Sequence, residues 1–400
     1  MRIGIDIRPL MEGKITGVEV YTINLLQNLF KLDQKNSYLL FSNSFKPATM
    51  PNFDFPNVTI KNFRYPNKLF NFSLKFLDWP KIDRLLNGLD IFFSPRYLFT
   101  ALSPDCRLVV TVHDLSFVIN PEFFSLKGRL WHWLVSDKKA ARIATKVIAV
   151  SDSTKNDLIK HFRIDSKKIA VIHSGVNTQT YNPEVPDKLL REAKTIYNLP
   201  DEFILYLGTI EPRKNIEGII QAYEILRKKL SQNPSPQAWG DVPKGQRGRI
   251  VQPALVLAGG LGWSYKGIME MINNSPYRAS IRYLGAVEEK LKSPLYKLAK
   301  MLVFPSFYEG FGFPPLEAAA CGTPVIVGMN SSFPEVMGNA CLYVNPYNSV
   351  QIASAMEALL SDDKLRAELV SAGLARAKMF SWENSARELF EIFQSLKINS

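Results

Sequence analysis

The chain has 400 residues, 46% of them hydrophobic and 22% charged, a composition that excludes a disordered or low-complexity protein. This length exceeds what one hydrophobic core usually serves and predicts two domains of roughly 150 to 200 residues each. The formal net charge of +12 is concentrated in residues 1–170, which hold 25 basic against 15 acidic residues. This excess of positive charge favours a polyanion, an anionic membrane or a phosphate-bearing substrate as partner.

The sequence carries few signals of compartment. Charges at Arg2, Asp6 and Arg8 fall where a secretory leader would have its apolar core, and no apolar run reaches the roughly 18 residues of a membrane span. The three cysteines lack Cys-x-x-Cys spacing, which indicates neither a disulfide framework nor a zinc site. We therefore expect a cytoplasmic protein that does not cross a bilayer.

Apolar runs typical of buried strands alternate with stretches of helical period along most of the chain. The runs in the first half are residues 2–7, 38–42, 90–94, 107–114, 146–151 and 168–175, and those in the second half are 203–208, 254–260, 281–285, 300–306, 323–328 and 340–345. This alternation predicts α/β architecture with doubly wound parallel sheets, and the two series predict two similar Rossmann-like units. Turn-forming residues at 175–186 predict the linker, so we expect domains at 1–178 and 179–381.

Residues 61–86 interleave basic and aromatic side chains. The basic ones are Lys61, Arg64, Lys68, Lys75 and Lys81, and the aromatic ones are Phe63, Tyr65, Phe70, Phe72, Phe76 and Trp79. Two interpretations stay open. The segment contacts an anionic membrane surface, or its aromatic residues are core and its lysines are solvated. Residues 231–250 read as an inserted surface loop, more in keeping with an insertion without function than with a substrate lid.

A basic pair precedes a predicted helix in the second half. Asn215 is a good N-cap, and apolar residues recur at helical spacing from 216 to 230, so Arg213 and Lys214 lie between a strand's carboxyl end and a helix N-terminus. Two cations beside unpaired helix N–H groups favour an anion, and a diphosphate is the natural occupant. The alternative is a solvated surface pair.

Two glutamates flank a glycine-rich turn in "FYEGFGFPPLEAAACGTPV", residues 307–325. Glu309 is expected in a loop after a strand and Glu317 in the first turn of the next helix, both at the edge of the cleft. Carboxylates accept hydrogen bonds from vicinal hydroxyls, which favours a sugar for one and a ribose for the other, facing the basic pair across the gap between domains. The alternatives are a favourable helix charge at Glu317 and a hydrolase acid and nucleophile pair.

These stretches together resemble glycosyltransferase family 4, retaining enzymes of GT-B fold that use nucleotide sugars. The similarity covers nearly the whole chain through the blocks "TGVEVYTINLL", "VVTVHDLSF", "VIAVSDSTKNDL", "VIHSGVNTQTYNP", "YLGTIEPRKN", "LAGGLGW", "EGFGFPPLEAAACGTPV" and "FSWENSARELF". The resemblance implies two Rossmann-like domains facing each other across a cleft, with the last helix, about residues 382–400, crossing back onto the first.

The resemblance implies roles for nine positions. In the family's pattern Glu309 contacts the donor sugar, Glu317 contacts the ribose, and the backbone of Phe311, Gly312 and Leu316 contacts the sugar and phosphate. Arg213 and Lys214 match the diphosphate clamp, His113 matches a histidine of the sugar pocket, and Gly17 matches a loop near the diphosphate.

For His113 and for the loop at Gly17, the neighbouring residues also allow a structural role. A lone histidine at a strand end is more often a structural hydrogen bonder, and Asp114 beside it is a candidate helix cap. Where relatives often have Gly-Arg, this chain has Glu19-Val20. Thr16 and Glu19 have capping-box spacing, so phosphate binding there would use backbone N–H groups.

The implied activity is metal-independent transfer of a hexose to a glycan or polyprenyl-diphosphate-linked saccharide in polysaccharide biosynthesis. Retention of configuration is implied with it. The form "GTIEPRKN" favours mannose from GDP-mannose, and no Asp-x-Asp sequence is present to hold a metal. No cofactor and no nucleic-acid partner are expected. The protein is expected in the cytoplasm, with peripheral contact at the inner face of the membrane. The alternatives are a non-catalytic nucleotide-sugar or glycan-binding protein and a basic nucleic-acid-binding protein. A dinucleotide-dependent oxidoreductase is disfavoured because no Gly-x-Gly-x-x-Gly follows the first strand.

Overall fold

The computed structural model describes residues 1–12, 16–45, 52–126, 128–129, 137–232 and 252–397. Packing divides the chain into two compact units. Unit 1 is Met1–Pro121, Leu126–Gly175 and Ser381–Ser400, and unit 2 is Glu122–Ser125 and Val176–Phe380. The predicted domain bounds stay a prediction, and most of the predicted insertion at 231–250 lies outside the described residues.

Unit 1 is built on a seven-stranded sheet in the order β3-β2-β1-β4-β5-β6-β7, in which every pair is parallel. The strands are β1 (Arg2–Asp6), β2 (Ser37–Asn43), β3 (Val58–Phe63), β4 (Ile91–Ser94), β5 (Arg107–Val112), β6 (Lys146–Ala149) and β7 (Ile169–Val171). Each predicted run of the first half forms a strand. The sequence analysis missed β3, an edge strand whose polar residues alternate with only partly buried ones and so give no apolar run.

The helices of unit 1 begin with α1, whose predicted capping box is confirmed, since the Thr16 N–H donates to Glu19 Oε2 at 2.7 Å. The α-helices are α1 (Gly17–Leu32), α2 (Asn67–Phe72), α3 (Ile82–Leu85), α4 (Ser116–Ile119), α6 (Asp137–Ile143), α7 (Asp152–Asp157) and α16 (Trp382–Ser395). Shorter helical segments are η1 (Arg8–Glu12), η2 (Ser73–Leu77), η4 (Leu158–Phe162) and η5 (Ser166–Lys168), and η3 (Pro121–Phe123) enters unit 2.

The C-terminal helix α16 packs on α1 in unit 1, with the rings of Tyr21 and Trp382 5.8 Å apart. Gly175, at the end of the second stretch of this unit, makes room for it. A Cβ on Gly175 would lie 2.3 Å from the backbone nitrogen of Trp382.

We expect Gly175→Ala to lower the free energy of unfolding by about 1–3 kcal/mol, because the added methyl group displaces the start of α16. Urea denaturation measures the loss. Gly267→Ala in α10 is the matched control, because a Cβ there would meet no atom within 4 Å. Equal stability of the two variants would contradict this account of Gly175.

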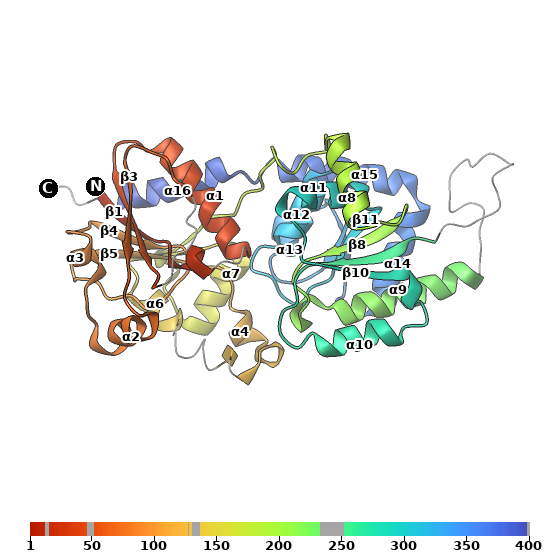
Figure 1. Ribbon diagram of the computed structural model, residues 1–400, viewed down its shortest axis with the longest axis horizontal. Helices are drawn as coiled ribbons and strands as arrows, with labels where there is room; N and C mark the ends of the chain where they lie inside the picture. The colour runs from red at the N-terminus through yellow and green to blue at the C-terminus, as the bar shows by residue number, and fades with distance from the viewer. Residues whose placement is uncertain (13–15, 46–51, 127, 130–136, 233–251, 398–400) are drawn as a thin grey trace. The chain divides into compact units, whose positions relative to one another are not determined.

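Unit 2 is built on a six-stranded parallel sheet in the order β10-β9-β8-β11-β12-β13. Its strands are β8 (Phe203–Leu207), β9 (Ala254–Ala258), β10 (Ile281–Gly285), β11 (Met301–Phe304), β12 (Val325–Gly328) and β13 (Leu342–Val344), each within a predicted run. Helices lie on both faces of this sheet (Figure 1). They are α8 (Asp187–Ile196), α9 (Ile216–Gln232), α10 (Lys266–Asn274), α11 (Glu289–Leu298), α12 (Phe313–Ala320), α13 (Phe333–Met337), α14 (Ser349–Ser361) and α15 (Asp363–Ala377), with η6 (Pro212–Lys214) and η8 (Arg278–Ser280).

The strand order of unit 2 decides where a ligand can bind. Counted from β8, the order is 3-2-1-4-5-6, the doubly wound pattern in which the winding reverses between the first and fourth strands. The loops after β8 and β11 therefore leave the same edge of the sheet side by side and turn to opposite faces. The prediction of two doubly wound α/β units is confirmed.

Candidate functional site

Two loops meet at the switch point of unit 2. Arg213 and Lys214 lie in η6 after β8, and Glu309 lies in the loop after β11. The loops are tied through the backbone, because the Phe307 N–H donates to the Arg213 carbonyl at 2.9 Å. The Arg213 guanidinium donates in return to the Tyr308 carbonyl at 2.6 Å.

Asn215 holds η6 in place. It adopts a left-handed backbone conformation with φ of 58°, and its side-chain oxygen accepts the Gly218 N–H at 3.2 Å as the predicted cap of α9. Its side-chain nitrogen donates to the carbonyls of Pro305 and Pro346 at 3.2 and 2.6 Å. One amide thus caps the helix and fastens the β8 loop to the β11 loop.

A cluster of four charged residues fills the junction, which we call the switch-point cluster: Glu211, Arg213, Lys214 and Glu309. Arg213 bridges the two carboxylates, with Nη2 2.9 Å from Glu211 Oε1 and Nη1 3.1 Å from Glu309 Oε2. Lys214 Nζ donates to Glu309 Oε1. The four side chains are at most 12% exposed, so their charges interact with little screening by water.

The two carboxylates of the cluster differ in electrostatics. Burial by itself raises the pKa of Glu309, but the charges of Arg213 and Lys214 outweigh it and hold that pKa below the ordinary value. Burial dominates at Glu211, whose pKa lies above the ordinary value despite the same two cations. Glu309 is therefore the ionised partner of both cations near neutral pH.

Arg213 and Lys214 were predicted to bind a diphosphate beside helix N–H groups, and Glu211 was not predicted as part of the site. The structure shows that both cations already contact Glu309, 95 and 96 residues further along the chain. The solvated surface pair is wrong, because both side chains are 12% exposed. Glu211 lies two residues before Arg213 in "TIEPRKN", and this close acidic neighbour was the available signal.

The glycine-rich loop leads from Glu309 into α12 at Phe313. Gly312 has φ of 92°, a conformation that favours glycine, and a Cβ there would lie 2.8 Å from the Phe333 ring. The Ser332 hydroxyl donates to the carbonyls of Glu309 and Phe311, both at 3.0 Å. Ser332, which was not predicted as a site residue, therefore orients two carbonyls of the glycine-rich loop toward its own hydroxyl.

Glu317 lies apart from the switch-point cluster in its contacts. It is 7% exposed and lies in the second turn of α12, so its predicted place in the first turn was wrong, whereas Glu309, also 7% exposed, lies in the predicted loop after a strand. The Tyr296 hydroxyl donates to Glu317 Oε2 at 2.8 Å. Burial raises the pKa of Glu317, and Lys292 partly offsets it.

All four predicted residues, Arg213, Lys214, Glu309 and Glu317, belong to unit 2. The expectation that the basic pair faces the glutamates across the gap between domains is therefore wrong. The cause lies in the strand order, which brings the loops after β8 and β11 to one edge of one sheet. Leu316, which lies between Glu309 and Glu317 in the sequence, has a fully buried side chain on α12, so only its backbone could face a ligand.

We expect Tyr296→Phe to weaken nucleotide binding if Glu317 holds the ribose, because the variant removes the hydrogen bond that orients this carboxylate. The buried carboxylate would lose a partner, at a cost of about 1–3 kcal/mol in free energy of unfolding. Calorimetry with a nucleoside diphosphate and urea denaturation measure the two effects. The control is Tyr343→Phe, which removes a tyrosine hydroxyl that donates to a backbone carbonyl, that of Gly338, in the same unit. Unchanged nucleotide affinity in Tyr296→Phe would remove Glu317 from the ribose site.

The predicted residues of unit 1 are His113 and Gly17. His113 follows β5, and its Nε2–H donates to the Pro95 carbonyl at 2.8 Å while its ring packs edge-on against Tyr21, 4.8 Å between centroids. Burial lowers the pKa of His113, which favours the neutral ring. Asp114 accepts from the Ser116 N–H at 3.0 Å but lies one residue before the N-cap of α4, which is Leu115. Gly17 is exposed at the first residue of α1.

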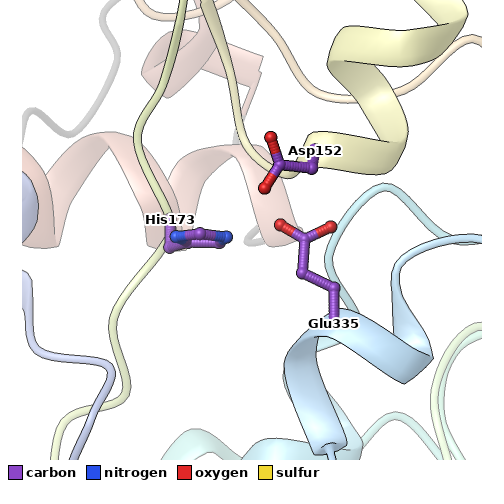
Figure 2. A group of neighbouring side chains, drawn as sticks. All are labelled: Asp152, His173 and Glu335. Carbon is purple, nitrogen blue, oxygen red and sulfur yellow. The ribbon is translucent and has the colours of Figure 1, made fainter.

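Figure 2 draws another set of ligand-type side chains, Asp152 and His173 with Glu335. Asp152 opens α7 and His173 follows β7 in unit 1, whereas Glu335 lies on α13 in unit 2. The three side chains are divided between two units, and we assign no metal site to them.

Comparisons with known proteins show the family of the chain. The family model for glycosyl transferases group 1 matches residues 190–376, and the model for Glycosyltransferase Family 4 matches residues 15–180. O-antigen chain mannosyltransferase B of Escherichia coli is 33% identical over 290 residues, which cover 72% of this chain and 71% of that protein. The chain belongs to glycosyltransferase family 4.

Further relatives and solved structures resemble this glycosyltransferase. The serotype-specific mannosyltransferase WbdA of E. coli is 33% identical over 291 residues, 72% of this chain but only 34% of WbdA. Sucrose-phosphate synthase of Thermosynechococcus elongatus superposes with a TM-score of 0.74 at 20% identity, covering 99% of this chain and 98% of that one. HepE of Anabaena, crystallised with UDP and glucose, has a TM-score of 0.70 at 16% identity, covering 98% and 99%. The resemblance to family 4 and the GT-B fold are confirmed, and the chain is a glycosyltransferase.

Proposed function

We propose that this glycosyltransferase moves mannose from a nucleotide sugar, GDP-mannose as the first candidate, to a saccharide or polyprenyl-diphosphate-linked saccharide in polysaccharide biosynthesis. The observation that carries the proposal is the buried switch-point cluster, in which two cations and an ionised glutamate meet at the carboxyl edge of a doubly wound sheet. The names of the E. coli mannosyltransferases, at 33% identity, support mannose as the sugar.

The chemistry follows from where charge develops. Breaking the bond between the sugar and the nucleotide diphosphate places positive charge on the anomeric carbon and negative charge on the leaving oxygens. Arg213 and Lys214 supply fixed positive charge for those oxygens, which is the kind of preorganised stabilisation that usually dominates catalysis. In this proposal the two cations take the place of a metal ion, and the leaving phosphate accepts the acceptor's proton on the same face, with retention.

Glu309 has two tasks in this proposal. In the structure it pairs with both Arg213 and Lys214, which lowers the cost of burying two cations in one place. When a diphosphate contacts the cations, the carboxylate can accept hydrogen bonds from the hydroxyls of the donor sugar. The backbone N–H groups of Phe311 and Gly312 lie directly after it in the chain and serve the sugar and phosphate.

Three further predicted positions have roles in this proposal. Glu317 accepts from the ribose hydroxyls, and Gly17 offers the first backbone N–H of α1. Neutral His113 offers Nδ1 to a sugar hydroxyl, since its Nε2–H donates to the Pro95 carbonyl.

Donor screening tests the proposal. The protein is incubated with GDP-mannose and with UDP- and GDP-linked hexoses, each with a saccharide acceptor, and release of nucleoside diphosphate is followed. Release that requires GDP-mannose and acceptor is the expected result. Release with another donor would overturn the mannose assignment, and binding of donors without release would identify a non-catalytic nucleotide-sugar-binding protein.

Location is part of the proposal. We place the enzyme in the cytoplasm, where nucleotide sugars are supplied, with peripheral contact at an anionic membrane that carries a lipid-linked acceptor. Within the described ranges, no helix is both long and apolar enough to span a bilayer.

A further inference from the structure

A second surface, in unit 1, is marked by exposed apolar side chains. The helical segment formed by α2 and η2, residues 67–77, and the residues after it carry five strongly exposed large apolar side chains. They are Leu69 (69% exposed), Phe72 (56%), Phe76 (61%), Leu77 (64%) and Trp79 (66%). We call these five the α2 face; α2 is drawn in orange in Figure 1.

The α2 segment is apolar on two opposite sides. Phe70 and Leu74, four residues apart, are 4% and 3% exposed and belong to the core of unit 1. Leu69, Phe72 and Phe76 recur at spacings of three and four and so share the opposite side. The sequence left open whether these aromatics were core or surface, and the structure assigns Phe70 to the core and Phe72 and Phe76 to the surface.

Basic side chains border the α2 face. Residues 61–84 hold six Lys and Arg and only two acidic residues. Both acidic side chains are engaged, Asp78 with Lys81 at 2.5 Å and buried Asp83 with the Ser103 N–H at 2.8 Å. Lys68 lies one helical turn before Phe72 and is exposed, and Lys75 Nζ lies 5.0 Å from the centre of the Phe76 ring.

We propose that the α2 face is a membrane-contact surface that inserts its apolar side chains into the headgroup region of an anionic bilayer. Large apolar residues with Trp at the edge and long cationic side chains alongside are what an interfacial helix requires. The charge complementarity selects anionic lipid. A nucleic acid would pair with the cations but leave Leu69 and Leu77 without an apolar partner.

This surface deepens the proposed function, because a lipid-linked acceptor lies in such a bilayer, but its test needs neither donor nor transfer. Binding to vesicles of phosphatidylcholine alone and of phosphatidylcholine with phosphatidylglycerol is measured by sedimentation. We expect binding to the anionic vesicles at low salt and loss of the anionic preference at about 1 M salt, where the Debye length is about 3 Å.

Two sets of variants separate the apolar and charged contributions. The triple variant Leu69→Ser, Phe72→Ser, Phe76→Ser should lower partitioning at least about tenfold, since three large apolar side chains no longer insert. The triple variant Lys61→Gln, Arg64→Gln, Lys68→Gln should lower binding to anionic vesicles about a hundredfold at low salt. The control Ile143→Ser, Ile196→Ser, Val350→Ser removes exposed apolar side chains elsewhere and should bind as the unmodified protein does.

A site-specific probe tests insertion itself. The three native cysteines are buried, so an exposed cysteine can be labelled selectively with an environment-sensitive fluorophore. The label on Leu69→Cys should shift to the blue with anionic vesicles, while the label on Ile143→Cys should not. Absence of the shift, or equal sedimentation of the apolar triple variant, would overturn the proposal. A concentration-dependent dimer that the apolar triple variant abolishes would assign the face to a second copy instead.

The outcomes remain distinct from those of the donor test. Loss of vesicle binding with unchanged release of nucleoside diphosphate to a soluble saccharide separates the surface from the active site. Failure of donor turnover with normal vesicle binding would count against the proposed function alone.

Discussion

Glu309→Gln is expected to lower the rate of mannosyl transfer about a thousandfold while leaving GDP affinity little changed. Glutamine keeps the size of the side chain and loses the charge that Arg213 and Lys214 contact at Oε2 and Oε1. The cations then remain available to a diphosphate, but the proposed acceptor for the donor sugar's hydroxyls is weakened. Transfer assays and calorimetry with GDP measure the two effects separately.

The control is Glu357→Gln, which removes a glutamate from an ion pair with Lys229 whose lysine side chain is 55% exposed, in the same unit. Surface pairs of this kind contribute little, so both transfer and affinity should stay unchanged. Equal losses of transfer and GDP affinity in Glu309→Gln would contradict the assignment of Glu309 to the sugar, because they would mean that the site as a whole had been damaged.

Arg213→Ala is expected to weaken GDP binding about tenfold to a hundredfold and guanosine binding hardly at all, because only GDP carries the diphosphate. The same change leaves the buried carboxylates of Glu211 and Glu309 short of a partner. Breaking a buried ion pair on one side costs about 3–5 kcal/mol, so the free energy of unfolding should fall as well. Calorimetry with GDP and guanosine and urea denaturation measure these effects.

A double variant separates binding from stability. Arg213→Ala combined with Glu211→Gln removes the carboxylate that Arg213 contacts at 2.9 Å, and we expect it to recover part of the lost stability. It should recover none of the lost GDP affinity. If affinity returned together with stability, Arg213 would be a structural residue, and the diphosphate would have to be bound elsewhere.

Local pattern predicted much of this molecule. Every predicted apolar run forms a strand, because strands buried between two helical layers are continuous in apolar residues. Thr16 with Glu19 and Asn215 were placed correctly as helix starts, since a cap depends on residues within one turn. Edge strand β3 was missed because one of its sides is solvated, so its residues form no continuous apolar run.

The site depended on information that no local pattern holds. Arg213 and Glu309 are 96 residues apart, and they meet because β8 and β11 are neighbours in a sheet whose winding reverses there. Glu317 was placed one turn too early on its helix, since neither the first residue of α12 nor the hydrogen bond from Tyr296 can be predicted from spacing.

By itself the sequence determined the α/β class, the two series of strands, the family and the residue types that carry the chemistry. These depend on neighbours in the chain or on motif order. Only the tertiary structure decided that Arg213 and Lys214 both pair with Glu309 and that Glu211 shares Arg213. It also decided that Phe70 is buried while Phe72 and Phe76 are exposed. The reason is physical: burial and ion pairing are set by strand order and helix orientation, which place residues distant in sequence within hydrogen-bonding reach.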